Sequence, residues 1–177
     1  MNPLTHFKKI RILPLLIALM LVVGVAPTRA TPSCGVVSVA LAPTGHFQSG
    51  LLDLGCTSNL PAWLLETIVK GNSDVYIIQN TFPPGAHTGW HTHPGPSLIT
   101  VTAGTITAYD ASNTTCTPKI YTAGQSFTDI GCGDVHLLRN EGGVNAVTVA
   151  VQIVPAGAPR RIDVPVPPSN CPLISCP

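Results

Sequence analysis

Short runs of apolar residues, separated by glycine, proline and small polar residues, make up most of the chain. Within many of these runs apolar and polar positions alternate, as they do in β-strands that bury one face. In residues 63–82 we expect two strands with a turn at Gly71–Asn72, and a short helix over 61–70 is the alternative, because periodicity does not separate the two. The same alternation predicts strands within residues 34–45, 45–56, 119–130, 135–140 and 145–155.

The clearest predicted β-hairpin lies at residues 97–110. Val101, Ile106 and Ala108 can face inward there while threonines alternate outward, with the turn at Ala103–Gly104. Many short strands at regular spacing favour an all-β sandwich or barrel. The proline-rich residues 156–177 predict an extended strap that crosses the domain.

The composition agrees with a turn-rich β protein. Only 10% of the residues are charged and 5% are aromatic, whereas Gly (16) and Pro (18) are frequent, which argues against long helices and coiled coils. An apolar share of 45% with a formal net charge of +1 is sufficient to bury a core and argues against disorder. A chain of 177 residues predicts a single domain.

The first thirty residues have the layout of a secretory signal peptide. A basic head (Lys8, Lys9, Arg11) precedes an apolar run at residues 12–26, and Ala30 offers a cleavage site; a retained N-terminal anchor is the alternative. Cleavage predicts a secreted or extracytoplasmic protein, either periplasmic or at the cell surface. The remaining chain carries 5 Lys+Arg and 8 Asp+Glu, a formal charge of 5 − 8 = −3, so nucleic acid and the membrane surface are poor candidates as partners.

All six cysteines follow residue 30, which in an oxidising compartment predicts up to three disulfide bonds. No CxxC pair is present, and this weakens a thioredoxin-like or zinc-ribbon interpretation. Six cysteines allow 15 connectivities, among which the sequence does not choose. Cys171 with Cys176, and Cys34 with Cys56, are two local options.

Histidines are concentrated in residues 87–93. His91 and His93 are two residues apart, so on a β-strand both imidazoles face the same side and can reach one point. Imidazole nitrogens suit Zn, Cu, Fe or Ni better than Mg or Ca. His136, on a separate predicted strand, is the best candidate for a third ligand.

Two segments resemble the two motifs of the cupin superfamily. The first family motif is G-x5-H-x-H-x3–4-E-x6-G, and this chain has Gly85, His91, His93, Ser97 and Gly104 at the matching positions. The second is G-x5-P-x-G-x2-H-x3-N. The matching residues, with one extra residue after the first glycine and glycine in place of proline, are Gly124, Gly131, Gly133, His136 and Asn140.

The resemblance implies a double-stranded β-helix, or jelly-roll barrel, whose core spans residues 74–155, with residues 31–73 supplying outer strands and connections. It implies that His91, His93 and His136 hold a metal ion. The family's glutamate is replaced by Ser97, so we expect three histidines with open positions for water or substrate. Loss of an anionic ligand makes such a site one unit more positive and favours Lewis acidity and an anionic substrate. Fe, Cu, Ni or Zn then becomes more probable than Mn. Alternatively, the loss of the carboxylate abolished metal binding and left a small-molecule pocket.

Other residues near the motifs have structural or functional interpretations. His87 is either a fourth ligand or proton-transfer group, or a loop histidine. Ser97 could still lie at the metal, and Asp134 is either a hydrogen-bond acceptor for a ligand imidazole or a turn residue. Trp90 is expected in the core, and Asn140 is expected to shape a turn.

These observations predict an exported, disulfide-braced cupin with a three-histidine metal site. The first functional hypothesis is a non-haem metal-dependent dioxygenase acting on a small organic molecule. The second is a non-catalytic domain that binds or senses a metal or small ligand, and the third is a structural protein with vestigial histidines. Fold alone does not choose among them. Cupins often pair through sheet edges, so the resemblance also allows a homodimer.

Overall fold

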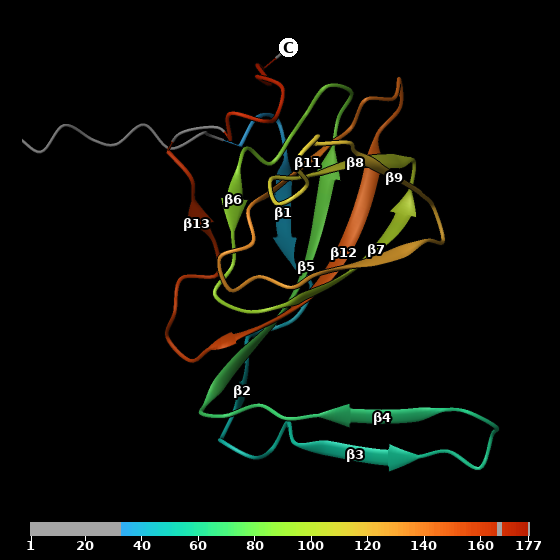
Figure 1. Cartoon of the computed structure of the whole chain (residues 1–177), viewed down its shortest axis with the longest axis vertical. Coiled ribbons are helices and arrows are strands. Elements are labelled where there is room, and N and C mark those ends of the chain that lie inside the picture. Colours follow the sequence, from blue (N-terminus) through green and yellow to red (C-terminus); the bar gives the residue numbers. More distant parts are fainter. Residues whose placement is uncertain (1–32, 166–167, 177) are drawn as a thin grey trace, which may run out of the picture.

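The computed structural model describes residues 33–165 and 168–176, so the predicted signal segment lies outside the described residues. Two antiparallel sheets face each other and form a barrel, from which a small third sheet projects as an arm (Figure 1). The described residues contain no helix that is long and apolar enough to cross a membrane. The two facing antiparallel sheets confirm the prediction of an all-β jelly-roll barrel.

The larger sheet is centred on the longest strands. Its neighbouring strands run in the order β1 (Val37–Ala40), β5 (Ser73–Phe82), β12 (Ala146–Pro155), β7 (Ser97–Ala103) and β10 (Ser126–Asp129), and β2 (Gly45–Phe47) also pairs with β5. Along β12 nearly every second residue is buried, because one face of the strand is turned toward the barrel interior.

The second sheet closes the barrel and carries two of the three site histidines. It runs in the order β13 (Ile162–Asp163), β6 (His91–Thr92), β11 (His136–Arg139), β8 (Thr105–Asp110) and β9 (Lys119–Thr122). The inner faces of the two sheets pack into one apolar cluster. Its buried members are Phe82, Ala86, Ile99, Val101, Ile106, Leu138, Ala146 and Ala150.

The predicted hairpin at residues 97–110 is wrong, although both of its strands are present. β7 pairs with β12 and β10, whereas β8 pairs with β11 and β9, so the chain passes from one sheet to the other at Gly104. Gly104 has φ +67°, and a Cβ there would lie 2.6 Å from the carbonyl oxygen of Asn145. Local alternation does not distinguish a hairpin from a corner between sheets, because both need a tight turn.

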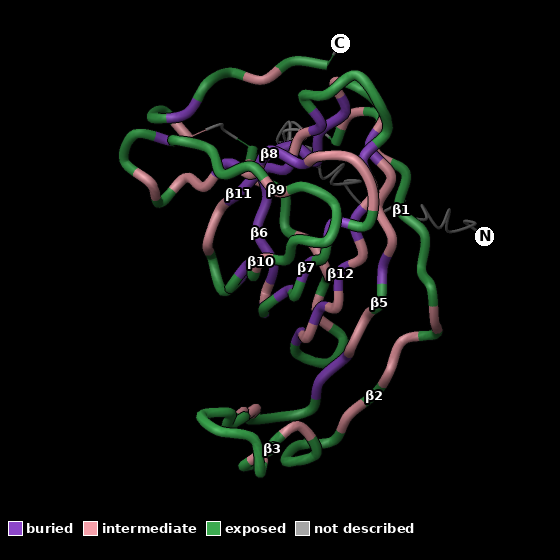
Figure 2. The backbone as a smooth tube through the Cα atoms, turned by 90° about the vertical axis from the view of Figure 1, so that its right-hand side faces the viewer, coloured by how far each residue is buried: buried purple, intermediate pink, exposed green. Residues whose placement is uncertain are grey.

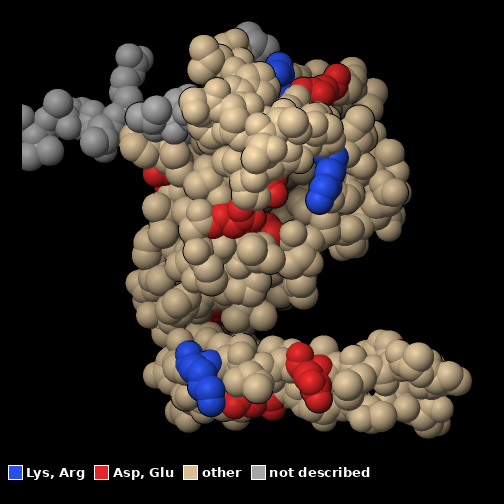
Figure 3. All heavy atoms as spheres, viewed as in Figure 1, with Lys and Arg blue, Asp and Glu red and all other residues tan. Residues whose placement is uncertain are grey.

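Residues 63–82 form two strands, and the alternative of a helix over 61–70 is wrong. The first of them, β4 (Leu64–Thr67), pairs with β3 (Leu54–Thr57) to make the arm. The arm is exposed while the buried residues gather in the barrel (Figure 2). In the space-filling view the arm is separated from the barrel by an open recess, and few charged side chains interrupt the surface (Figure 3).

One disulfide joins the two ends of the described chain, and a second ties its C-terminal part to the barrel. They join Cys34 to Cys176 and Cys116 to Cys171, while Cys56 and Cys132 are exposed thiols. The two local pairings considered from the sequence are therefore wrong. The barrel brings segments 142 and 55 residues apart into contact, and sequence proximity gave no guide to these pairs.

Candidate metal site

Three buried imidazoles meet inside the barrel, as predicted. His91 and His136 are direct register partners on β6 and β11, and His93 follows two residues after His91. The three rings offer nitrogen atoms that all lie within 4.8 Å of one another. Each side chain is almost fully buried, with exposed fractions of 4% for His91, 5% for His93 and 7% for His136.

Two glycines bring the loops that carry His93 and His136 together. A Cβ at Gly131 would lie 2.1 Å from the carbonyl oxygen of Gly95, so the two backbones touch where only glycine fits. Beside this contact the amide of Cys132 donates a 2.7 Å hydrogen bond to the carbonyl of His93. The approach of these loops fixes His93 and His136 on neighbouring sides of the site.

Backbone carbonyls orient two of the three rings. His91 Nδ1 donates to the carbonyl of Gly89 at 2.9 Å, and His93 Nδ1 donates to the carbonyl of Arg160 at 2.6 Å. A carbonyl only accepts hydrogen bonds, so the proton of each neutral ring is on Nδ1 and the lone pair is on Nε2. A hydrogen-bonded Nδ1 with a free Nε2 is the usual arrangement of a metal-ligating histidine.

Burial keeps the three imidazoles neutral. It lowers the pKa of His91 well below its ordinary value and lowers the pKa of His93 as well; the pKa of His136 falls to about 4 for the same reason, although Asp129 opposes the shift. The neutral form is the one that binds a metal ion. In addition, His136 Nδ1 and Asp129 Oδ2 are buried without a hydrogen-bond partner. The imidazole nitrogens and the carboxylate oxygen are ligand atoms that fit a divalent transition metal ion.

Ser97 faces the site without offering it a negative charge. Its side chain is fully buried, and its Oγ accepts a 3.1 Å hydrogen bond from Gln152 Nε2. Gln152 Oε1 in turn accepts from Arg160 Nη1 at 2.7 Å, so a polar chain runs from Ser97 to the C-terminal strap.

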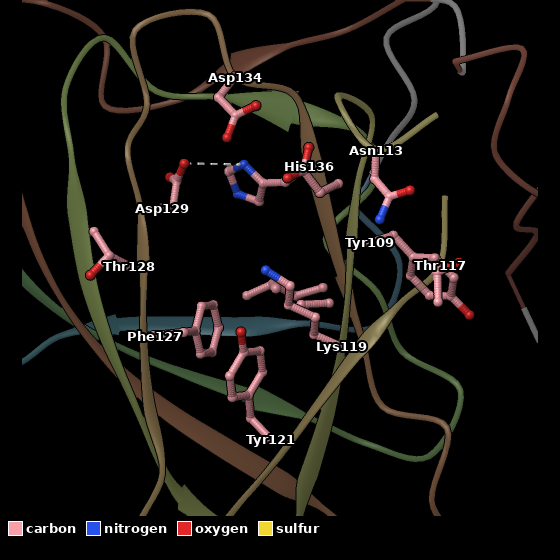
Figure 4. Close-up of a pocket in the computed structure, with 13 residues that line it drawn as sticks. Tyr109, Asn113, Thr117, Lys119, Tyr121, Phe127, Thr128, Asp129, Asp134 and His136 are labelled. Carbon is pink, nitrogen blue, oxygen red and sulfur yellow. Dashed lines mark ion pairs between the residues drawn. The ribbon is translucent and has the colours of Figure 1, made fainter. Parts of the chain in front are cut away.

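A carboxylate lies beside the histidines, contrary to the expectation from the motif. Asp129 Oδ2 is 3.6 Å from His93 Nε2, and Asp129 Oδ1 is 3.5 Å from His136 Nδ1 (Figure 4). The sequence interpretation missed Asp129 because it lies outside both motif positions for ligands. Alternation was the available signal, since Phe127 and Asp129 point inward on β10 while Thr128 is exposed.

Of the remaining predicted residues, Asp134 lies near the histidines, whereas His87, Trp90 and Asn140 lie elsewhere in the barrel. His87 is not with the three histidines but beside Cys34 and Cys176, where its Nδ1 accepts from the amide of Gly89. Asp134 lines the cavity next to His136 (Figure 4), and burial together with Asp110 and Asp129 raises its pKa. Trp90 packs in a second apolar cluster, as expected. Asn140 Nδ2 donates to the carbonyls of Phe82 and Val144, which fits its expected part in shaping a turn.

Two cavities meet the site from different sides. One, of ≈ 110 Å³, is lined by His136, Asp129, Asp134, Lys119 and Tyr121 among others (Figure 4). The other, of ≈ 130 Å³, is lined by all three histidines. Gln152, Arg160 and Arg161 also line this second cavity, so two guanidinium groups flank the imidazoles there.

This architecture is the double-stranded β-helix of the cupin fold. The assignment depends on the two facing antiparallel sheets, and on the two histidine segments lying at neighbouring strands of one sheet. In comparisons with known proteins, no family model and no curated protein matches the chain.

Solved structures of low sequence identity are similar to it. A cupin domain from Bordetella pertussis is 18% identical, covers 68% of this chain and 95% of its own, and has a TM-score of 0.45. A cupin superfamily protein from Desulfitobacterium hafniense is 13% identical over 67% of this chain and 77% of its own, with a TM-score of 0.43. A predicted oxalate decarboxylase from Thermotoga maritima is 22% identical over 48% of this chain and 83% of its own, with a TM-score of 0.38.

Proposed function

We propose that this chain is an exported metal-binding cupin in which His91, His93 and His136 hold one divalent transition metal ion. The observation that carries the proposal is the orientation of His91 and His93: their Nδ1 atoms are hydrogen-bonded to carbonyls, so the Nε2 lone pairs can bind a ligand. At His93 this ligand would replace a long contact of 3.4 Å between Nε2 and Gln152 Nε2. Neutral imidazoles of this kind favour Fe, Cu, Ni or Zn.

The activity we propose is metal-dependent oxygen chemistry, of the dioxygenase type, on a small organic acid. When bound, such an ion supplies Lewis acidity and, for Fe or Cu, redox chemistry. The side chains around it favour an anionic substrate, because Arg160 lines the cavity that contains the three histidines. Arg161 lines it too, but its charge is offset by the ion pair with Asp163. A cavity of ≈ 130 Å³ has room for a small organic molecule.

A non-catalytic binding protein is the second candidate. The polar chain from Ser97 through Gln152 to Arg160 lies along one side of the histidines, and all three rings are deeply buried. These features favour a site that retains a ligand over one that exchanges substrate and product rapidly. In this case the chain would bind an organic anion without consuming oxygen.

Metal analysis of untagged protein tests the proposal. We expect one ion per chain in the wild type and a large loss in His91→Ala and His136→Ala. His46→Ala is the matched control, because the His46 side chain is 78% exposed and is hydrogen-bonded to Asp74 far from the group. Equal metal content in all four proteins, or none in the wild type, would overturn the proposal. Oxygen uptake with small organic acids then separates the enzyme from the binding protein.

Export is proposed from the predicted signal segment and is supported by the two disulfides, which form in oxidising compartments. N-terminal sequencing of protein recovered from outside the cytoplasm should begin at Thr31. A chain that retains its first thirty residues would contradict cleavage.

A further inference from the structure

We propose that Asp129 supplies the anionic metal ligand that position 97 lacks, so the carboxylate of this site comes from β10 instead of β7. This inference rests on the proposed metal site. It replaces the three-histidine site expected from the sequence with a site of three histidines and one aspartate.

The sheet register places Asp129 next to the substituted position. Asp129 and Ser97 are direct register partners on the antiparallel strands β10 and β7. Paired residues point to the same face of a sheet, with Cα atoms about 4.5–5.5 Å apart. Both side chains are buried on the interior face, at 7% and 0% exposure. A carboxylate on β10 is therefore displaced by one strand from a carboxylate at position 97. Its oxygens still lie 3.6 Å from His93 and 3.5 Å from His136.

The contact between Asp129 and His93 would be stabilised by a cation bound to both side chains. His93 Nδ1 donates to Arg160, so the Nε2 that faces Asp129 carries a lone pair, and the carboxylate Oδ2 only accepts. These two acceptor atoms lie 3.6 Å apart in a buried place. Asp129 Oδ2 has no hydrogen-bond partner, while His93 Nε2 has a long contact of 3.4 Å with Gln152 Nε2. Two ligands each bonded at about 2.0–2.2 Å in tetrahedral coordination lie roughly 3.4 Å apart, so one metal ion bonded to both relieves the contact.

The other carboxylate oxygen holds the group in place. Asp129 Oδ1 accepts a 2.9 Å hydrogen bond from the amide of Gly131, in the loop that leads to His136. Oδ1 is therefore engaged by the backbone, beside His136, while Oδ2 remains directed at His93. This division suits a carboxylate that binds a metal through a single oxygen.

A carboxylate ligand changes the charge of the site. Three neutral imidazoles leave a divalent ion at its full charge, whereas Asp129 lowers the net charge by one. It therefore offsets the more positive site expected from the glutamate-to-serine change, and it returns Mn to the ions that the site can hold.

Metal affinity of the isosteric variant Asp129→Asn tests the inference, with Zn²⁺ and Co²⁺ titrated against a chromophoric chelator. We expect the affinity to fall by more than about 10-fold, because one anionic ligand is lost. Glu66→Gln is the control: it removes a carboxylate from the exposed arm, away from the histidines, and we expect an affinity near that of the wild type. Ser97→Glu in the Asp129→Asn background should restore binding by returning the carboxylate to β7.

The visible spectrum of the Co²⁺ protein separates a ligand from a residue that only orients His136. Loss of a ligand changes the intensity and position of the bands, whereas loss of an orienting group weakens binding with the bands preserved. Unchanged affinity, or unchanged bands, in Asp129→Asn would overturn the inference while the three-histidine proposal stands. Absence of metal from the wild type would overturn both. Melting of the apoproteins checks that each variant is folded, and Asp129→Ser serves if the amide variant is not.

Discussion

The backbone carbonyl of Arg160 accepts a hydrogen bond of 2.6 Å from His93 Nδ1, so the C-terminal strap is attached directly to one site histidine. The same residue donates through its guanidinium to Gln152. Strap and site are therefore one structural unit. The main-chain contact orients the imidazole, while the side chain faces the cavity that would receive an anion.

Replacing Arg160 by alanine should separate these two contributions. The carbonyl remains in Arg160→Ala, so metal affinity should stay close to that of the wild type. Loss of a charged hydrogen-bond donor costs about 1.5–3 kcal/mol, which corresponds to roughly 10- to 150-fold weaker binding of a small carboxylate. Calorimetric titration of the metal-loaded protein with a short dicarboxylate measures this change. Arg160→Lys keeps the charge and should recover part of the affinity; a carboxylate affinity that is equal in all three proteins would contradict the assignment of the cavity.

Two neighbouring glycines should respond differently to alanine. Gly131 (φ +61°) and Gly133 (φ +99°) both have left-handed backbone conformations, but only at Gly131 would a Cβ collide with another backbone. We expect Gly131→Ala to lower the free energy of unfolding by about 3–5 kcal/mol and to weaken metal binding, since strain and overpacking add. Gly133→Ala should cost only about 1–2 kcal/mol. Urea unfolding measures both, and similar losses for the two variants would show that the loop contact at Gly95 is unimportant.

The native protein should contain two reactive thiols. Cys56 and Cys132 are exposed, and the other four cysteines are paired. Titration of the unreduced protein with a thiol reagent should give two equivalents, falling to one in Cys56→Ser and in Cys132→Ser. Cys116→Ser should lower stability by about 2–5 kcal/mol. A count of zero would point instead to a third disulfide or to pairing between chains.

Tyr109 should make the protein sensitive to alkali. Burial, followed by its hydrogen bond to Glu141, raises the pKa of Tyr109 from 10.0 to about 12. The folded protein thus retains this proton at a pH where the unfolded chain has lost it. Its contribution to stability is complete below pH 10 and disappears as the pH rises toward 12. Tyrosinate absorbance in the near ultraviolet should show a late ionisation that is missing in Tyr109→Phe, and the variant should lose less stability over the same range.

The part of the site that follows strand periodicity could be predicted from the sequence. A spacing of two residues places His91 and His93 on one side, and the motif at residues 131–140 identifies His136. For Asp129 periodicity predicts only a side chain turned inward on β10. Its place beside the histidines comes from a register between β10 and β7 that no local pattern records. The motif position that it neighbours is occupied by a serine, which directed attention to the absence of a carboxylate.

The fold shows the same division between local and long-range information. Strands β7 and β8 were predicted, yet their separation into two sheets depends on pairing with β12 and β11, whose sequences lie about 30 to 50 residues further on. The disulfides are a second case. Cys34 reaches Cys176 only because the first described strand segment and the end of the strap meet beside His87, and no spacing rule connects those residues.

The disulfide between Cys34 and Cys176 closes the main chain between these two cysteines into a covalent ring. A protease that cuts once between these cysteines, for example in the exposed arm, opens the ring without releasing a piece. Nicked and intact molecules would then have the same mass apart from one water, and would separate by size only after reduction. In an environment rich in proteases, a chain closed in this way can lose a peptide bond and still keep its barrel assembled.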